Sequence, residues 1–328
     1  MKHIVAFLLL SHLSFAQTSF EQHKEVLLLM GSRFEITAVA DSKEIAQDAV
    51  LASIQEIERI EALISSWQED SQTSGINRQA GIRAVRVDKE LFQLIERSKK
   101  ISNLTQGAFD ISFASMGRLY TFDREEHPLP SSAELEQRIS KINWQDILLN
   151  HEEMSVFLKQ KGMKIGFGGI GKGYAANKAK ELIQNMPGVH GGLINASGDL
   201  IAFGETNKKG GWPIQVADPK DKLKSIGWLE IENMSVVTSG DYEKFFTNNN
   251  LRYAHIINPK TGLPSTGIKS VTVICPDAEI GDALATSIFI LGKTEGIQLV
   301  NTLKNIEALI ITDQDEIVTS RHLILNRY

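Results

Sequence analysis

The hydrophobic residues in the first third of the chain form a pattern that predicts strand structure followed by two helices. Apolar positions recur through residues 26–40 and are interrupted at residues 30–32, where Met-Gly-Ser breaks the strand pattern. Asp41 followed by Glu44 is typical of a helix start in which the aspartate is the N-cap. The apolar positions that follow are spaced by three and four, as on one helix face: Val50, Ile54, Ile57, Ile60 and Ile64. We expect a second helix over residues 89–103.

The rest of the chain combines short strands with helical patterns. Polar, turn-rich sequence over residues 121–132 predicts a surface connection. From residue 147 onward, strand-like segments rich in Ile, Val and Trp recur between glycine-rich turns and two further helical patterns. The sequence contains no internal repeat and no low-complexity linker, so we predict one α+β unit over residues 17–328.

Composition and charge restrict the class of protein. Of the 328 residues, 42% are hydrophobic, which is enough to build a substantial buried core. The 35 basic residues are scattered along the chain and are outnumbered by 40 acidic residues, for a net charge of -5. Because nucleic-acid binding needs a clustered basic surface, we expect no nucleic-acid partner.

Residues 1–16 have the features of a cleaved signal peptide. A lysine precedes an apolar run, and Ser14 and Ala16 place small residues at the cleavage-defining positions. A membrane anchor is the alternative, but the run is shorter than the roughly 20 apolar residues that a spanning helix needs. The single cysteine, Cys275, lies far from this segment at the end of an apolar run and is expected to be buried. We therefore expect an exported, periplasmic protein that neither spans the membrane nor carries a lipid anchor.

A glycine-rich segment over residues 164–177 is a candidate for binding a phosphate group. Its glycines follow an apolar strand pattern and precede a helical run: Gly166, Gly168, Gly169, Gly171 and Gly173. Backbone N–H groups that lack neighbouring side chains can approach an anion at a helix start, and Lys172 adds a positive charge there. The spacing matches neither of the common phosphate-binding motifs, so phosphate binding and simple packing are both open.

Asp282 and Thr286 are candidate ligands of a metal ion. They lie four residues apart in a helical pattern that opens near residue 281, so they share one helix face. Carboxylate and hydroxyl oxygens are ligands that Mg²⁺ takes beside phosphate oxygens and water. The alternative is that Asp282 only caps the helix.

His255 is the candidate catalytic residue. It follows an alternating strand pattern and precedes the turn at residues 259–262, a position from which a scaffold can present a base or a nucleophile. Thr238 and Ser239 stand near another strand end, where their hydroxyls could hold a ligand or cap a turn. Trp67 could stack on a flat ring or close the core.

Seven segments, taken in order, resemble the ApbE family, the FAD:protein FMN transferases. The segments are residues 30–32, 107–110, 168–174, 195–199, 238–242, 255–259 and 282–286. The resemblance covers nearly the whole chain after residue 16. It implies a bilobal α+β fold of mixed sheets with helices, in which FAD lies in a central cleft.

The resemblance also implies a role for individual residues. Residues at or near FAD would be Met30, Trp67, Ala108, Phe109, Asp110, Lys172, Thr238, Ser239 and Ile257. Mg²⁺ would be held by Asp282 and Thr286, with backbone oxygens near Gly169 and Ala285. FMN would pass from FAD to a Ser or Thr hydroxyl of an acceptor protein, with AMP as the leaving group.

The resemblance leaves three questions open. His255 would act either as the base for the acceptor hydroxyl or as a nucleophile that carries FMN transiently. The alternative functions are an FAD pyrophosphatase that yields FMN and AMP, and an exported flavin-binding protein without turnover. Five positions depart from the commoner family pattern, which affects the expected adenosine contacts: Gly166, Asn177, Ser197, Asn258 and Ile111.

Overall fold

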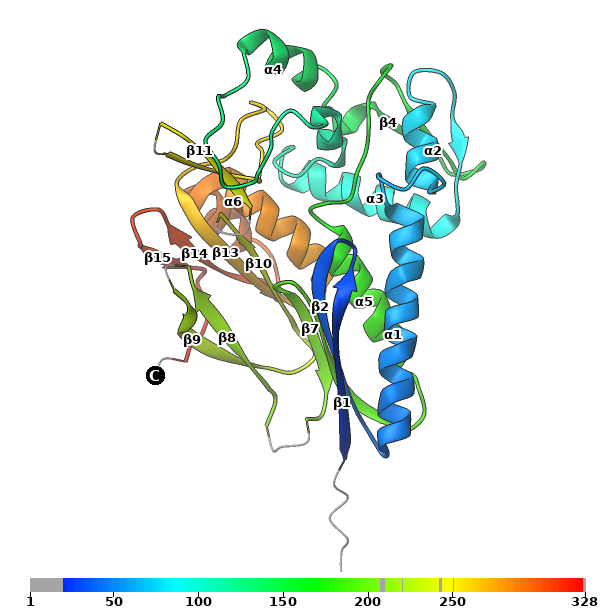
Figure 1. Cartoon of the computed structure of the whole chain (residues 1–328), viewed down its shortest axis with the longest axis vertical. Helices are drawn as coiled ribbons and strands as arrows, with labels where there is room; N and C mark the ends of the chain where they lie inside the picture. The colour runs from blue at the N-terminus through cyan, green and yellow to red at the C-terminus, as the bar shows by residue number, and fades with distance from the viewer. Residues whose placement is uncertain (1–19, 207–209, 220, 242–243, 250, 327–328) are drawn as a thin grey trace, which may run out of the picture.

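The largest element of the fold is an eight-stranded antiparallel sheet. A computed structural model describes residues 20–206, 210–219, 221–241, 244–249 and 251–326 (Figure 1). The strand order is β1-β2-β6-β7-β10-β13-β14-β15, and all seven ladders between these strands are antiparallel. The bounds are β1 (Glu21–Leu29), β2 (Ser32–Ala40), β6 (Val189–Ala196), β7 (Asp199–Gly204), β10 (Ser235–Gly240), β13 (Ile268–Cys275), β14 (Glu307–Thr312) and β15 (Ile317–Thr319).

The two faces of this sheet are covered differently. Helices α1 (Lys43–Ile64), α5 (Gly171–Ile183) and α6 (Ala278–Val300) pack on one face and form the main core with it (Figure 1). The hairpin of β8 (Trp212–Asp218) and β9 (Asp221–Ile231) contributes to a second core with the sheet, which includes Leu200 of β7, Val236 of β10 and Leu309 of β14. Burial of both faces explains the continuous apolar runs of the central strands.

A second group of elements lies at one end of the large sheet (Figure 1). It contains α2 (Gln72–Arg78), α3 (Lys89–Leu104), α4 (Ser132–Ile139), the short helices η1 (Ile111–Met116) and η2 (Trp144–Asp146), and a small sheet. That sheet has the order β3-β5-β4, with β3 (Val85–Arg86), β4 (Ile147–Asn150) and β5 (Ser155–Leu158). A separate hairpin joins β11 (Phe245–Asn248) to β12 (Leu251–Ala254). The α+β class is therefore confirmed.

Three helix starts differ from the prediction. The N-cap of α1 is Ser42 and not Asp41, because the Ser42 hydroxyl accepts the amide of Ile45 at 3.3 Å while Asp41 contacts His190. Helix α5 begins at Gly171, inside the glycine-rich segment. Helix α6 begins at Ala278 and is capped by Asp277. The alternative that Asp282 caps this helix is therefore wrong.

Helix α6 is the one described helix that is long and apolar enough to cross a membrane by length and composition. The helix is kinked, because Gly292 has the non-helical angles φ 82° and ψ 175°. Its first half packs against β10 and β13, and residues such as Leu284 and Ile288 are fully buried there. The apolar composition of α6 is therefore that of a core helix.

Candidate functional site

The glycine-rich segment lies directly on helix α6. A Cβ atom on Gly173 would lie 2.0 Å from the carbonyl oxygen of Ala278 and 2.9 Å from Cβ of Asp282. A Cβ atom on Gly169 would lie 3.1 Å from Oγ1 of Thr286. The missing side chains therefore let the start of α5 approach the two predicted metal ligands. The Gly173 amide donates to Oδ2 of Asp282 at 3.1 Å, so this amide binds a protein carboxylate.

We predict that Gly173→Ala destabilises the protein by at least about 2 kcal/mol, because the added methyl group forces the two helices apart. Thermal unfolding of the variant measures this effect. Gly168→Ala is the matched control, because a Cβ atom there meets nothing within 4 Å. Equal unfolding temperatures for the two variants would contradict the close approach of α5 to α6.

Asp282 has the environment of a carboxylate that needs a cation. It is 3% exposed, and its burial raises the pKa of the carboxyl group above its ordinary value. The nearby Lys172 charge and backbone N–H groups act in the opposite direction. Thr286 is on the same helix face, and its hydroxyl lies next to the Gly169 backbone, in the space that a side chain at Gly169 would approach. These hard oxygens fit Mg²⁺, whereas Ala285 is fully buried and could offer only its backbone.

Lys172 is ion-paired with Asp199, a residue for which the sequence motifs predicted no individual role. Asp199 begins β7 and its side chain is 2% exposed, while Lys172 lies in the first turn of α5. The pair thus joins the glycine-rich segment to the large sheet. The sequence contained only a weak signal for Asp199, its place at the end of the segment 195–199.

His255 is held in a defined orientation at the end of β12. Its amide donates to the carbonyl of Lys244 at 3.0 Å, and Nδ1 lies 3.2 Å from the same oxygen. A proton on Nδ1 would be donated to this carbonyl and would leave the Nε2 lone pair free. Burial is the main cause that lowers the pKa of His255 to about 4, and the charges of Lys244 and Lys172 lower it further. The imidazole is therefore neutral at pH 7.

Two pockets meet at His255. The larger has a volume of about 980 Å³, and the smaller has a volume of about 150 Å³. Gly168 and His255 line both of them, while Lys172 lines the larger and Thr286 the smaller. A ligand with two bulky halves could occupy both pockets, and its central linkage would then lie beside His255.

Met30 and Trp67 line the larger pocket, as expected of residues near a flat ring system. Met30 and Gly31 form the two-residue turn between β1 and β2, with φ angles of 51° and 67° that match the hairpin turn with two positive φ values. Trp67 is 74% exposed, with the Arg118 guanidinium 5.3 Å from its ring centroid. The alternative that Trp67 closes the core is therefore wrong.

The smaller pocket is lined by four further residues that the resemblance placed near FAD: Ala108, Phe109, Asp110 and Ile257. Both carboxylate oxygens of Asp110 already accept hydrogen bonds from the protein, at 2.8 Å from the Ser112 amide and 2.9 Å from the Trp144 amide. Thr238 and Ser239 line neither pocket. The Thr238 hydroxyl lies 2.9 Å from that of Thr272 on β13, so the ligand role of this pair stays a prediction.

The structure places each of the five departures from the family pattern. Asn177 joins α5 to the start of α6, because its amide group bonds Asp277 at 2.7 Å and the Ala278 amide at 3.0 Å. Asn258 accepts the Lys260 amide at 2.9 Å in the turn after His255. The other three are Gly166 in the lining of the smaller pocket, Ser197 in the turn before β7 and Ile111 in the core.

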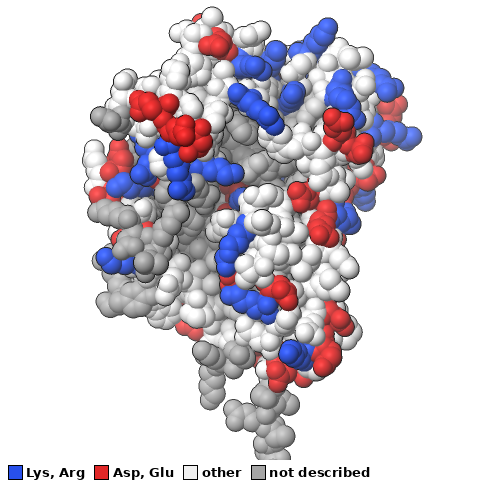
Figure 2. Space-filling view, viewed as in Figure 1, with Lys and Arg blue, Asp and Glu red and all other residues white. Residues whose placement is uncertain are grey.

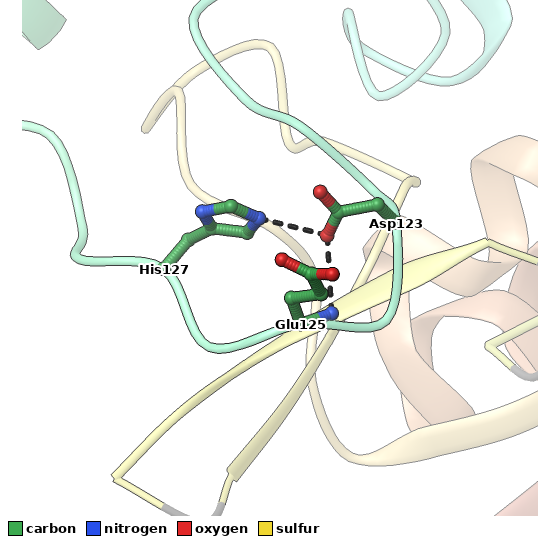
Figure 3. Close-up of side chains that lie close together, drawn as sticks. All are labelled: Asp123, Glu125 and His127. Atoms are coloured by element: carbon green, nitrogen blue, oxygen red, sulfur yellow. Dashed lines mark hydrogen bonds and ion pairs between the residues drawn. The ribbon is translucent and has the colours of Figure 1, made fainter.

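A second group of possible metal ligands lies outside both pockets. Figure 3 shows Asp123, Glu125 and His127 pointing toward one another, with ligand atoms within 4.8 Å. Oδ1 of Asp123 already contacts His127 Nε2 at 2.7 Å and the Glu125 amide at 3.0 Å. These contacts fold the segment that bonds to β11, where the His127 amide donates to Thr247. The group is therefore accounted for as local structure.

Comparisons with known proteins agree with this geometry. The family model described as "ApbE family" matches residues 30–310. An FAD:protein FMN transferase of Klebsiella pneumoniae is 33% identical over 279 residues, which are 84% of this chain and 86% of that protein. One of Treponema pallidum is 28% identical over 82% of this chain and 78% of its own length.

Solved structures show the same fold. The crystal structure of an ApbE protein from Thermotoga maritima has a TM-score of 0.83 and 29% sequence identity, over 92% of this chain and 97% of that one. The apo flavinyl transferase ApbE of Pseudomonas stutzeri has a TM-score of 0.78 at 22% identity, over 92% and 94% of the two chains. The chain described here therefore belongs to the ApbE family.

Proposed function

We propose that this protein is an enzyme that transfers the FMN half of FAD to a Ser or Thr hydroxyl of an acceptor protein. The observation that carries the proposal is the position of His255, with a free Nε2, where the two pockets meet. FAD consists of two bulky halves joined by a diphosphate, which suits this arrangement. Matched relatives are FAD:protein FMN transferases, which supports the choice of donor and acceptor.

The transfer breaks the bond between the FMN phosphorus and the bridging oxygen of the diphosphate, and that oxygen leaves with AMP. In the direct route, the acceptor oxygen bonds to this phosphorus and its proton passes to Nε2 of His255. In the two-step route, Nε2 bonds to phosphorus first and AMP leaves. The acceptor oxygen then displaces Nε2, and the acceptor proton passes to the released nitrogen. Both routes need a neutral imidazole with a free Nε2. Burial keeps the ring neutral, and the contact with the Lys244 carbonyl favours the proton on Nδ1.

Asp282 and Thr286 would hold Mg²⁺ close to the diphosphate, since Gly169 and Thr286 are at the wall of the smaller pocket. When bound, the ion would neutralise charge on the phosphate oxygens and orient the leaving group. The ion pair of Lys172 with Asp199 fixes the lysine at the larger pocket. Trp67 is exposed enough to stack on a ring of FAD.

Mass spectrometry of an acceptor protein after incubation with this protein, FAD and Mg²⁺ tests the proposal. We expect a mass gain of one FMN on the acceptor and an equal amount of released AMP. Release of FMN and AMP without an acceptor would instead support a pyrophosphatase. Bound FAD without either product would support a flavin-binding protein.

The depressed pKa of His255 predicts how transfer depends on pH. At saturating Mg²⁺, which would keep Asp282 ionised, protonation of His255 sets the acid limb. Protonation removes the Nε2 lone pair, so the rate should stay constant from neutral pH downward and fall as pH drops through about 4. The pH profile of kcat/KM with FAD measures this limb. An acid limb near 6.5, the ordinary pKa of histidine, would contradict the described environment of His255.

We further propose that the protein acts after export as a periplasmic enzyme and does not span the membrane. Residues 1–16, which support this proposal by composition, lie outside the described residues. N-terminal sequencing of the protein from the periplasmic fraction tests it, with a start at Gln17 expected.

Figure 2 shows acidic and basic side chains interspersed on the viewed face, and we propose no nucleic-acid partner.

A further inference from the structure

Three basic residues of the described chain line the larger pocket, and they differ in whether a carboxylate pairs with their charge. Arg33 donates to Glu35 at 3.1 Å, and Lys172 is ion-paired with buried Asp199. Lys244 is the third basic residue of this lining, and it makes no ion pair with any residue in the described part of the chain. Lys244 therefore brings a positive charge to the pocket that no described carboxylate offsets.

The β11–β12 hairpin fixes Lys244 beside His255. Lys244 immediately precedes β11, and His255 immediately follows β12, so the two residues face each other across the open end of the hairpin. The Lys244 carbonyl receives the His255 amide at 3.0 Å. Lys244 also acts on the ring through space, because its charge contributes to lowering the pKa of His255.

We propose that Lys244 binds the diphosphate of FAD and offsets negative charge on the phosphoryl group that is transferred. This inference rests on the proposed function, because it assigns a residue to the same reaction. An ammonium group offers a compact charge and three hydrogen-bond donors, which suits phosphate oxygens. Charge placed in advance beside a reacting group lowers the barrier most effectively. Lys172 contributes less net charge, because Asp199 already neutralises it.

Substitution of Lys244 tests the proposal. We expect Lys244→Met to lower kcat/KM for FAD by about 10-fold to 100-fold, the range for losing a hydrogen bond to a charged group. Lys244→Arg should retain most of the activity, because it keeps the charge. Lys260→Met is the matched control, since this lysine follows His255 closely in sequence but lines neither pocket. It should behave like the unsubstituted protein.

Two further readouts separate a phosphate contact from a structural role. The affinity for FAD, measured without acceptor by quenching of flavin fluorescence, should fall in Lys244→Met and lose part of its salt dependence. The acid limb of the pH profile should move to higher pH in Lys244→Met, because one of the charges that lower the pKa of His255 is removed.

The inference and the proposed function fail in different ways. Lys244→Met with unchanged kcat/KM, unchanged FAD affinity and an unchanged acid limb would overturn the inference while transfer itself persists. If the unsubstituted protein transferred no FMN, the proposed function would fail. The FAD affinities would then still test the phosphate contact, and equal affinities of Lys244→Met and the unsubstituted protein would overturn it. Lys244→Gln provides a second neutral variant if Lys244→Met does not fold.

Discussion

Replacing His255 with alanine should reduce FMN transfer by about 1,000-fold, within the range found for loss of a general base. The substitution removes the nitrogen that lies where the two pockets meet. Because β12 and the turn at Asn258 keep their backbone contacts, the fold and the FAD affinity should change little. Mass spectrometry of the acceptor gives the rate, and flavin fluorescence gives the affinity.

His127→Ala is the matched control for this prediction. His127 lies on the segment next to the same hairpin, 6.1 Å from the Phe246 ring, and lines neither pocket. It should leave transfer within about twofold of the unsubstituted rate, as surface changes usually do. Transfer by His255→Ala at the rate of His127→Ala would remove His255 from the mechanism.

The role of His255 can be resolved with the same measurement. In the two-step route, the enzyme incubated with FAD alone should gain the mass of FMN, and this gain should be absent from His255→Ala. In the direct route, only the acceptor gains mass. A stable FMN adduct on the enzyme that persists in His255→Ala would place the modified residue elsewhere.

Asp282→Asn should lower transfer by at least about 100-fold at limiting Mg²⁺, more than the loss of an outer contact to a metal ligand usually costs. Asparagine keeps the size of the side chain but removes the charge that attracts the cation. Excess Mg²⁺ should restore part of the activity. Titration of transfer against Mg²⁺ concentration measures both effects.

Asp277→Asn serves as the control for this substitution. Asp277 is the N-cap of α6, the helix that also carries Asp282. The Asp277 carboxylate accepts the Ile280 amide at 3.1 Å, and asparagine is an equally good cap. The Mg²⁺ dependence of Asp277→Asn should match that of the unsubstituted protein. An unchanged Mg²⁺ dependence of Asp282→Asn would contradict the metal assignment.

Unfolding measurements of Asp282→Asn give a readout that does not depend on activity. Burial raises the pKa of Asp282, so an ionised carboxylate at this position costs stability when no cation is bound. We therefore expect Mg²⁺ to raise the unfolding temperature of the unsubstituted protein and to have less effect on the variant. An equal shift in both proteins would place the cation elsewhere.

The sequence determined the elements whose signals are local. The spacing of Ile57, Ile60 and Ile64 gave α1, and the apolar runs gave the strands of the sheet, because burial of one face imposes a period on the residues that form it. The ordered motifs likewise identified the family, which the family model confirms over residues 30–310, while the roles of His255, Asp282 and Thr286 stay predictions. The local signal did not determine the N-cap of α1, since Asp41 and Ser42 are both good cap residues and only Ser42 accepts the Ile45 amide.

Tertiary structure decided what brings distant residues together. Nothing local marks Asp199 as the partner of Lys172 or Lys244 as the neighbour of His255, because the packing of α5 on β7 creates the first contact and the β11–β12 hairpin creates the second. Tertiary packing also decided that Gly173 lets α5 touch Asp282, and that Trp67 is exposed at a pocket. The sequence thus determined which chemical groups are present and to which family the chain belongs. Only the fold determined their distances, burial and charges, because these depend on residues far apart in the chain.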